Sequence, residues 1–445
     1  MEDSCPPEFL PVGADNDSTM RQLNNSTNKV KKVIYLDHAA TTPTRPEVIK
    51  AMAPFWSDKF GNPSALYKLG LEAKSATDTA RSNVASVLFC RPEEVVFTAG
   101  GSESINLAIL GSARNYRKNY KTGGHIITST IEHHAVLHTI GVLKKEGFTV
   151  TKISVDTMGV FNVAEVRKAI RPDTFLVSLM YANNEIGTIE PIAEIAKLIA
   201  AVNTSRLPTS PRLRRAGKSH SSRLLFHTDA CQAASFLDLN VNKLHVDMLS
   251  LNGSKIYGPK QTGCLYVRKG TKLEPLIYGG GQEKDLRSGT ENVPGIVGFA
   301  KALVLAQQSR EKESKKQALL RDYFITRLQK AIPSLKLNGP MPTTTKHNSN
   351  IRRLPNNINI SFAGVDGEAL VLYLDANNIC ASTGSACTSS STDPSHVLEA
   401  IGLELKFIKG SIRFTLGNST TKADLDKVLK ILPKLLTQVR AMRNS

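Results

Sequence analysis

The feature that most constrains the fold is an alternation of short apolar segments with longer amphipathic ones. The apolar segments are rich in β-branched and aromatic residues and have the length of buried strands. They comprise residues 94–98, 125–128, 174–179, 223–227 and 246–250. Amphipathic stretches such as Pro191 to Val202 lie between them and predict helices. Because strands that alternate with helices form parallel sheets covered by helices, we predict an α/β fold with a largely parallel sheet.

A long helical segment follows these strands. Leu320, Phe324 and Leu328 recur every four residues, so residues 296–332 predict one long helix, or two joined helices, with a single apolar face. We expect this segment to link the sheet domain to a smaller carboxyl-terminal domain. The chain shows no internal repeat.

Two segments fall outside this pattern. Residues 1–32 are polar, which predicts a disordered tail. They lack the apolar stretch of a secretory signal, and acidic residues before the first arginine argue against a transit peptide. Residues 203–222 are rich in Ser, Pro and Arg and contain no acid, so we expect an exposed loop there; a basic docking loop is the alternative.

Composition excludes several classes of protein. Hydrophobic residues make up 41% and charged residues 22% of the chain, as in ordinary globular proteins. No apolar run approaches the roughly 18 residues that span a bilayer. The six cysteines include no CxxC pair, so we expect neither a disulfide framework nor a metal site, and a reducing compartment is favoured. The net charge of +18 favours acidic or phosphorylated ligands without fixing a function.

Polar groups follow three of the predicted strands, where parallel sheets bind their ligands. Residues 99–104 carry two glycines and two serines before a helix, which predicts a phosphate cup; a plain capped turn is the alternative. Asp229 stands at the end of a later strand; a helix cap is the alternative interpretation. Lys255 lies in a turn, and a solvent-exposed lysine is the alternative there. Together a cup, an acid and a lysine match pyridoxal phosphate, which needs a lysine for its Schiff base, an acid at its ring nitrogen and a helix end at its phosphate.

Cys387 is the most informative cysteine. It lies among small polar residues in 382–391, a composition typical of a mobile loop, whereas Cys264 lies in an apolar run. Cys380, beside Ile379, fits a core position. This context favours a reactive thiol at Cys387, whose site must then stabilise the thiolate.

Taken in order, these motifs resemble the cysteine desulfurases of the NifS/IscS type, in the class V aminotransferase group of fold-type I pyridoxal-phosphate enzymes. The resemblance covers about residues 33–440. The matching stretches are 34–43, 97–103, 132–133, 181–187, 227–232, 255–260, 287–290, 385–388 and 413–417.

The resemblance implies a two-domain architecture. A large cofactor-binding domain over 45–307 would hold a mainly parallel seven-stranded sheet flanked by helices. Residues 33–44 and 308–440 would form a smaller α+β domain that carries the reactive-cysteine loop.

The resemblance also implies individual roles. Lys255 resembles the Schiff-base lysine that later moves a proton, and Asp229 the partner of the ring nitrogen. His133 resembles the histidine that stacks on the ring, although a core histidine is the plainer interpretation. Arg413 resembles the arginine that binds the substrate carboxylate, a task suited to a bidentate guanidinium. The remaining implied cofactor-binding residues are Gly101, Ser102, Glu103, Asn184, Gln232, Asn252, Ser254 and Thr290. Among them, the resemblance implies that Ser102 contacts the phosphate. It implies that Asn184 and Gln232 bind the phenolic oxygen and that Asn184 also contacts the substrate.

The implied activity converts L-cysteine to L-alanine and leaves the sulfur as a persulfide on Cys387. Acceptor proteins for iron–sulfur cluster, thio-cofactor or tRNA-thiolation pathways would then take the sulfur. Because Thr290 resembles a residue that reaches the phosphate of a neighbouring subunit, the resemblance implies a homodimer, and its setting would be cytoplasmic.

Several positions depart from the family pattern. Ser254 and Asn252 stand where relatives commonly have histidine and serine at the phosphate, and Tyr67 stands where many have histidine. A selenocysteine lyase on the same scaffold is an alternative function, because Tyr67 and the insert over 203–222 resemble that branch, whereas residues 384–388 resemble the desulfurases more. A non-catalytic basic binding protein is a distant one, because aromatic residues do not interleave with basic ones as nucleic-acid binding would require. We expect no membrane association.

Overall fold

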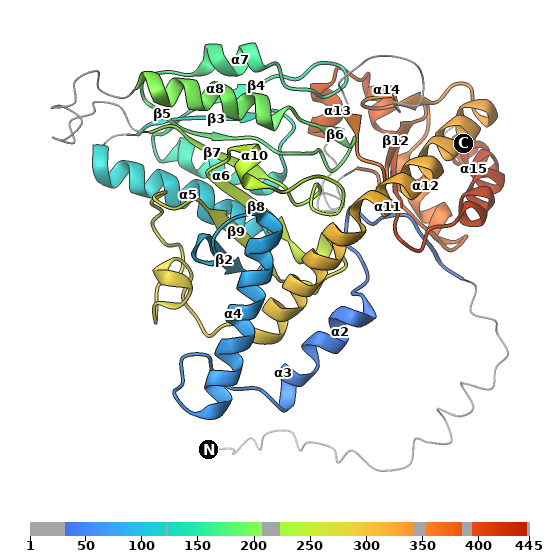
Figure 1. Ribbon diagram of the computed structural model, residues 1–445. Helices are drawn as coiled ribbons and strands as arrows, with labels where there is room; N and C mark the ends of the chain where they lie inside the picture. Colours follow the sequence, from blue (N-terminus) through green and yellow to red (C-terminus); the bar gives the residue numbers. More distant parts are fainter. Residues whose placement is uncertain (1–31, 122, 207–222, 342–351, 385–393, 443–445) are drawn as a thin grey trace, which may run out of the picture. The chain divides into compact units, whose positions relative to one another are not determined.

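A seven-stranded sheet organises the computed structural model, which describes residues 32–121, 123–206, 223–341, 352–384 and 394–442 (Figure 1). The strand order is β2-β9-β8-β7-β5-β3-β4. Neighbouring strands from β8 to β4 pair in parallel, whereas β9 is antiparallel to both β8 and β2. The strands are β2 (Val95–Thr98), β3 (His125–Ser129), β4 (Thr149–Ile153), β5 (Thr174–Ser178), β7 (Leu225–Asp229), β8 (Met248–Asn252) and β9 (Gly263–Val267). The predicted, mainly parallel α/β sheet is confirmed.

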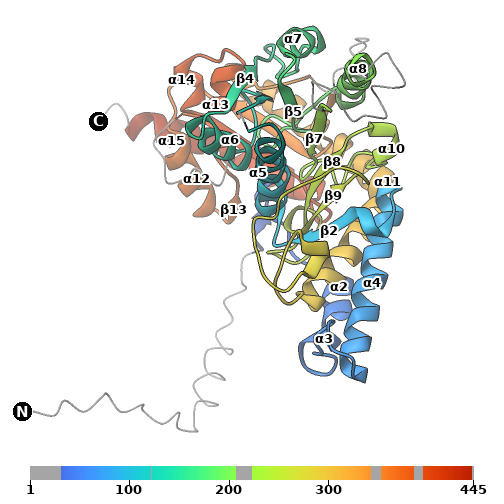
Figure 2. The same cartoon turned by 90° about the vertical axis from the view of Figure 1, so that its left-hand side faces the viewer.

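Alternating side chains along these strands build a core on each face of the sheet. On one face Val96, Ile126 and Leu176 pack under α5 (Gly101–Tyr120) and α6 (His134–Lys145). On the other face Val177 and Phe226 pack with residues of α4 (Lys68–Leu88), α8 (Ile192–Ser205), α10 (Val241–Leu244) and α11 (Val293–Ala331). Figure 2 shows α5 and α6 on one side of the strands and α8, α10 and α11 on the other. The sheet is therefore buried on both faces, as its continuous apolar strands predict.

A separate apolar cluster lies beyond the sheet. It joins Ile34 and Leu36 to buried residues between Phe324 and Val439. Its framework is a three-stranded antiparallel sheet of β10 (Lys336–Leu337), β12 (Asn357–Ser361) and β14 (Ser411–Thr415), with α12 (Gly367–Asp375) and α15 (Lys422–Met442). β1 (Ile34–Tyr35) pairs in parallel with β13 (Ile379–Cys380). This second core supports the predicted small domain, whose boundaries remain a prediction.

The helix α11 connects the two cores as a single element of 39 residues. Phe299 and Leu303, toward its start, belong to a core of the large sheet, whereas Phe324 and Leu328, toward its end, belong to the second core. The helix begins at Val293, where the side chain of Asn292 accepts a hydrogen bond from the Gly295 N–H. The long linking helix predicted over 296–332 is confirmed, and of the two forms it is one continuous helix.

The remaining elements are short. They are α2 (Pro46–Met52), α3 (Pro54–Ser57), η1 (Pro92–Glu94), α7 (Val163–Ala169), β6 (Thr188–Ile189), η2 (Gly253–Lys255), η3 (Gln282–Asp285), β11 (Arg352–Arg353), α13 (His396–Ala400) and α14 (Leu405–Ile408). Within the described ranges, every helix is too short or too polar to cross a lipid bilayer.

The expected loop over 203–222 begins later than predicted. α8 continues to Ser205, and the guanidinium of Arg206 then donates to the carbonyl oxygens of Thr174 and Arg171, at 2.8 and 2.7 Å. These bonds tie the first basic residue of the insert to the end of the sheet, so the sequence boundary at Asn203 is wrong. Residues 207–222 and the tail over 1–31 lie outside the described residues.

Candidate active site

A cavity lies at the carboxyl ends of the parallel strands, where β7 and β8 finish side by side. This is the edge at which parallel sheets bind ligands. Nine of the predicted site residues line the cavity together: Gly101, Ser102, His133, Asn184, Asp229, Gln232, Asn252, Lys255 and Arg413. They come from both halves of the sequence and from both cores. The structure therefore brings together most of the site that the sequence indicated.

The predicted phosphate cup lies where β2 ends and α5 begins. Gly100 has φ 139° and ψ −176°, a conformation that essentially only glycine adopts. A Cβ atom there would meet only the side chain of Asn252, at 4.0 Å, so the space beside this glycine is open. The first N–H groups of α5, at Gly101, Ser102 and Glu103, have no acceptor within the helix. A 20-residue helix also presents a positive dipole end here, so the cup suits an anion.

Glu103 supports this cup from outside and does not line the cavity. Its carboxylate accepts the Ala99 N–H at 2.9 Å and pairs with Arg287 at 3.1 Å. The first of these bonds fixes the turn between β2 and α5. The second joins the turn to the loop that carries Thr290, which is exposed and likewise lies away from the cavity.

Asp229 is the buried acid of the site, with 8% of its surface exposed. Its Oδ1 accepts the Cys231 N–H at 2.9 Å. Residues 231–236 form turns, so the alternative role of Asp229 as the cap of a helix starting at Ala230 is wrong. The carboxylate is instead held at the end of β7, on the ligand-binding edge.

Lys255 ends the short helix η2 that follows β8. Its Nζ donates to the carbonyl oxygen of Ala40. Close by, the Gln232 side chain donates to the carbonyl oxygen of Ala39 at 3.0 Å. The segment around Ala39 and Ala40, from the start of the described chain, therefore forms one wall of the cavity. The wall lies within the matching stretch 34–43, in which no site residue was predicted from the sequence.

His133 caps α6 and borders the cavity. Its Nδ1 accepts the Ala135 N–H at 3.0 Å, so the proton of the neutral ring is on Nε2. Behind it, burial raises the pKa of Glu132 to about 8, while the Ser129 hydroxyl and the Met180 N–H donate to its carboxyl group. The neighbouring His134 is half-buried, and burial together with the nearby histidines lowers its pKa to about 4.

Arg413 is almost completely buried, with 1% of its surface exposed, on β14 of the second core. Its Nη1 donates to the carbonyl oxygen of Asn184 at 3.0 Å, and its Nη2 donates to Asp37 at 2.8 Å. Its Nε has no acceptor among the described residues. A buried N–H without a partner is energetically costly. Sequence reasoning identified Arg413 but missed Asp37, whose only signal was its place in the first motif.

Two departures from the family pattern interact with each other. The Asn252 side-chain oxygen accepts both the N–H and the hydroxyl of Ser254, each at 3.1 Å. Asn252 lines the cavity, whereas Ser254 does not. Tyr67, the third departure, is 62% exposed and also lies outside this lining.

The four described cysteines are free but unsuited to act as thiolates. Cys231 lines the cavity, yet burial and the charge of Asp229 raise its pKa well above the usual value. Burial likewise raises the pKa of Cys264, of Cys380 and of Cys90, the last to about 12. Cys387 lies outside the described residues.

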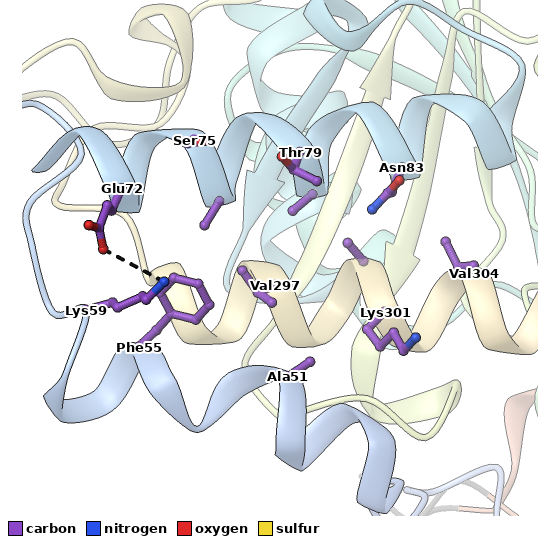
Figure 3. A pocket seen from close by; sticks show the side chains of 13 residues that line it. Ala51, Phe55, Lys59, Glu72, Ser75, Thr79, Asn83, Val297, Lys301 and Val304 are labelled. Atoms are coloured by element: carbon purple, nitrogen blue, oxygen red, sulfur yellow. Dashed lines mark ion pairs between the residues drawn. The ribbon is translucent and has the colours of Figure 1, made fainter. Parts of the chain in front are cut away.

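A second cavity, of about 520 Å³, lies between α2, α3, α4 and α11 (Figure 3). Ala51, Phe55 and Val297 contribute apolar surface, and Lys59 pairs with Glu72 across it at 3.8 Å. It contains none of the predicted site residues. In the part of the chain that the structure describes, no cluster of three His, Cys, Asp or Glu residues is arranged to hold a metal ion.

Comparison with known proteins places this geometry in context. Residues 34–206 and 211–428 match the family model of class-V aminotransferases. The cysteine desulfurase IscS of Dictyoglomus turgidum is 46% identical over 413 residues, which are 93% of this chain and 97% of that protein. A solved structure of a NifS-like protein is 34% identical with a TM-score of 0.80, over 91% of this chain and all of that one. A structure of SspA in complex with cysteine is 36% identical with a TM-score of 0.69, over 86% and 98% of the two chains.

Proposed function

Because this chain belongs to the class-V aminotransferase family and is a cysteine desulfurase of the NifS/IscS type, we propose that it converts L-cysteine to L-alanine with the aid of pyridoxal phosphate. One observation supports this most strongly. A lysine, a buried acid, an anion cup and a buried arginine converge on one cavity from distant parts of the chain. These are the groups that the cofactor and an amino-acid substrate require.

Enzymes of this family use pyridoxal phosphate, and the residues around the cavity fit it. The α5 N–H groups and Ser102 would hold the phosphate, Asp229 the ring nitrogen, and His133 one face of the ring. Asn184 and Gln232 would reach the phenolic oxygen, and the Lys255 amine would bond to the aldehyde carbon. When bound, the cofactor supplies an electron sink for negative charge at the substrate α-carbon.

The residues of the chain would then position the substrate and move its protons. Arg413 lines the cavity and would bind the substrate carboxylate through the N–H groups that its bonds to Asn184 and Asp37 leave. Lys255, the amine that lines the cavity, would move the proton at the α-carbon.

Cys387 would accept the sulfur. Its thiolate would attack the sulfur of the substrate, so that a sulfur–sulfur bond forms as the carbon–sulfur bond breaks and the electron pair stays with the carbon skeleton. The skeleton then takes up protons and leaves as L-alanine. The raised pKa values of Cys90, Cys231, Cys264 and Cys380 support this assignment, because none of these thiols is ready to ionise.

The persulfide would pass to acceptor proteins of iron–sulfur cluster, thio-cofactor or tRNA-thiolation systems. We also propose a homodimer, in which the exposed Thr290 of one subunit reaches the phosphate held by the other. The setting would be the cytoplasm, because the chemistry needs a free thiol and cytosolic thiols stay reduced.

The test combines cofactor and product measurements. The purified protein should show the visible absorbance of a bound cofactor and should release sulfide and alanine from L-cysteine in the presence of a reductant. Lys255→Ala should lose the cofactor band that depends on the covalent bond, and Cys387→Ser should lose sulfide release. Selenide from selenocysteine without sulfide from cysteine would show a selenocysteine lyase instead. Absence of an absorbance band after addition of pyridoxal phosphate would refute both the desulfurase and the lyase function.

A further inference from the structure

The inference starts from the partner of the buried arginine. Asp37 and Arg413 form an ion pair at 2.8 Å, with 14% and 2% of their side chains exposed. Among the described residues, Asp37 is the one carboxylate that pairs with this guanidinium. A charged group this deeply buried needs a counter-ion, so the pair supports the position of Arg413 in the absence of substrate.

The backbone fixes Asp37 independently of Arg413. Its carbonyl oxygen accepts hydrogen bonds from the Ala40 N–H and from the Tyr35 hydroxyl, both at 3.0 Å, and Asp37 forms a parallel bridge with Thr415. The same segment provides the carbonyl oxygens that accept from Gln232 and Lys255. Asp37 itself does not line the cavity, but this segment fixes its carboxylate beside Arg413, which does.

A ligand carboxylate must share Arg413 with this resident anion. One N–H of Nη1 donates to Asn184 and one N–H of Nη2 donates to Asp37, so a ligand carboxylate can use only the N–H groups that these two bonds leave. Two carboxylates on one guanidinium lie close together and repel each other. At an effective dielectric constant of about 20, such a repulsion reaches a tenfold effect at a separation of about 12 Å, so two carboxylates on one guanidinium weaken binding by at least about tenfold.

We propose that Asp37 is a positioning and specificity-determining residue, which holds Arg413 in place and, as its resident counter-ion, limits the affinity of the site for α-carboxylates. The affinity is lowered equally for L-cysteine and L-alanine, so the product L-alanine dissociates faster. Such uniform binding changes KM without raising the rate of the chemical step. This inference rests on the proposed function, from which it takes the identity of the ligand.

The test uses two ligands that differ only in the carboxylate. L-alanine and ethylamine are titrated into the cofactor-loaded wild type and Asp37→Asn, with the cofactor absorbance as the readout. Asparagine keeps an oxygen for the Nη2 donor and removes only the charge. We expect the dissociation constant of L-alanine to fall at least about tenfold and that of ethylamine to stay unchanged. The KM for L-cysteine should fall with the first value, without a matching rise in kcat.

Two further variants make the result specific. Asp247→Asn removes a buried aspartate that pairs with Arg268 at 3.5 Å outside the cavity, and it should change neither ligand's affinity. Asp37→Glu keeps the charge and should retain the wild-type preference. An unchanged or weaker affinity of Asp37→Asn for L-alanine would overturn the inference, and so would an equal change for both ligands. Failure of the wild type to release sulfide would instead count against the proposed function, because the titration needs no sulfur chemistry.

Discussion

Gly100 offers a sharp test of the phosphate cup. Replacing it with alanine forces a side chain onto a backbone with φ 139° and ψ −176°. No atom lies within 3.4 Å of the new methyl group, since the nearest is the Asn252 side-chain oxygen at 4.0 Å. The cost is therefore backbone strain alone, about 1–3 kcal/mol. The methyl group would also stand in the open space of the cup, so the affinity for pyridoxal phosphate should fall.

Gly141→Ala is the matched control. Gly141 lies inside α6, and a Cβ atom there would meet nothing within 4 Å. Alanine in a helix interior is about 0.5–1 kcal/mol more favourable than glycine, so this variant should be stabilised. The two glycine-to-alanine changes should therefore shift the unfolding free energy in opposite directions.

Urea unfolding of the cofactor-free proteins measures the free energy of unfolding, and titration with pyridoxal phosphate measures the affinity of the cup for the cofactor. Equal midpoints for Gly100→Ala and the wild type would refute the strained backbone at Gly100. A lower midpoint with unchanged cofactor affinity would leave the strain in place and refute the location of the phosphate.

Two further predictions concern the buried carboxyl groups of Glu283 and Glu132, with the exposed Asp173 as the control for the first. Glu283 pairs with Arg81 through two bonds, of 2.6 and 2.9 Å, and has 3% of its side chain exposed, so Glu283→Gln should lower the unfolding free energy by about 3–5 kcal/mol. Asp173→Asn, at an exposed pair with Arg171, should cost less than about 1 kcal/mol in the same urea assay; equal costs would contradict the role of burial. Burial raises the pKa of Glu132 from 4.5 to about 8, so the folded protein keeps a proton that the unfolded chain releases, and stability is lost as pH rises between these values. Glu132→Gln should therefore gain stability relative to the wild type over this range, and a pH-independent difference would speak against the raised pKa.

Local patterns were enough to predict the elements that hold the site. The strand predicted over 94–98, observed as Val95–Thr98, and the glycines after it marked the cup, and Asp229 and Lys255 marked the ends of two further strands. Each of these signals lies within a few residues, where turn chemistry and periodicity act directly.

The contacts that complete the site could not be predicted in this way. Asp37 meets Arg413 across 376 positions of the sequence, and the carbonyl oxygen of Ala40 meets Lys255 across 215. Such pairs depend on how β14 and the first described segment pack together, which no local pattern encodes. The extension of α8 into the expected loop was missed for a related reason, since the bonds of Arg206 to Arg171 and Thr174 are tertiary.

The central claim is that sulfur moves from L-cysteine to Cys387 in a reaction that needs Lys255. The most direct measurement is the intact mass of the cofactor-loaded protein after L-cysteine is added without a reductant, followed by peptide mapping. We predict a gain of sulfur on the peptide that contains Cys387, and no gain in Lys255→Ala. Sulfur on the peptide of Cys231, or a gain that persists in Lys255→Ala, would contradict the account.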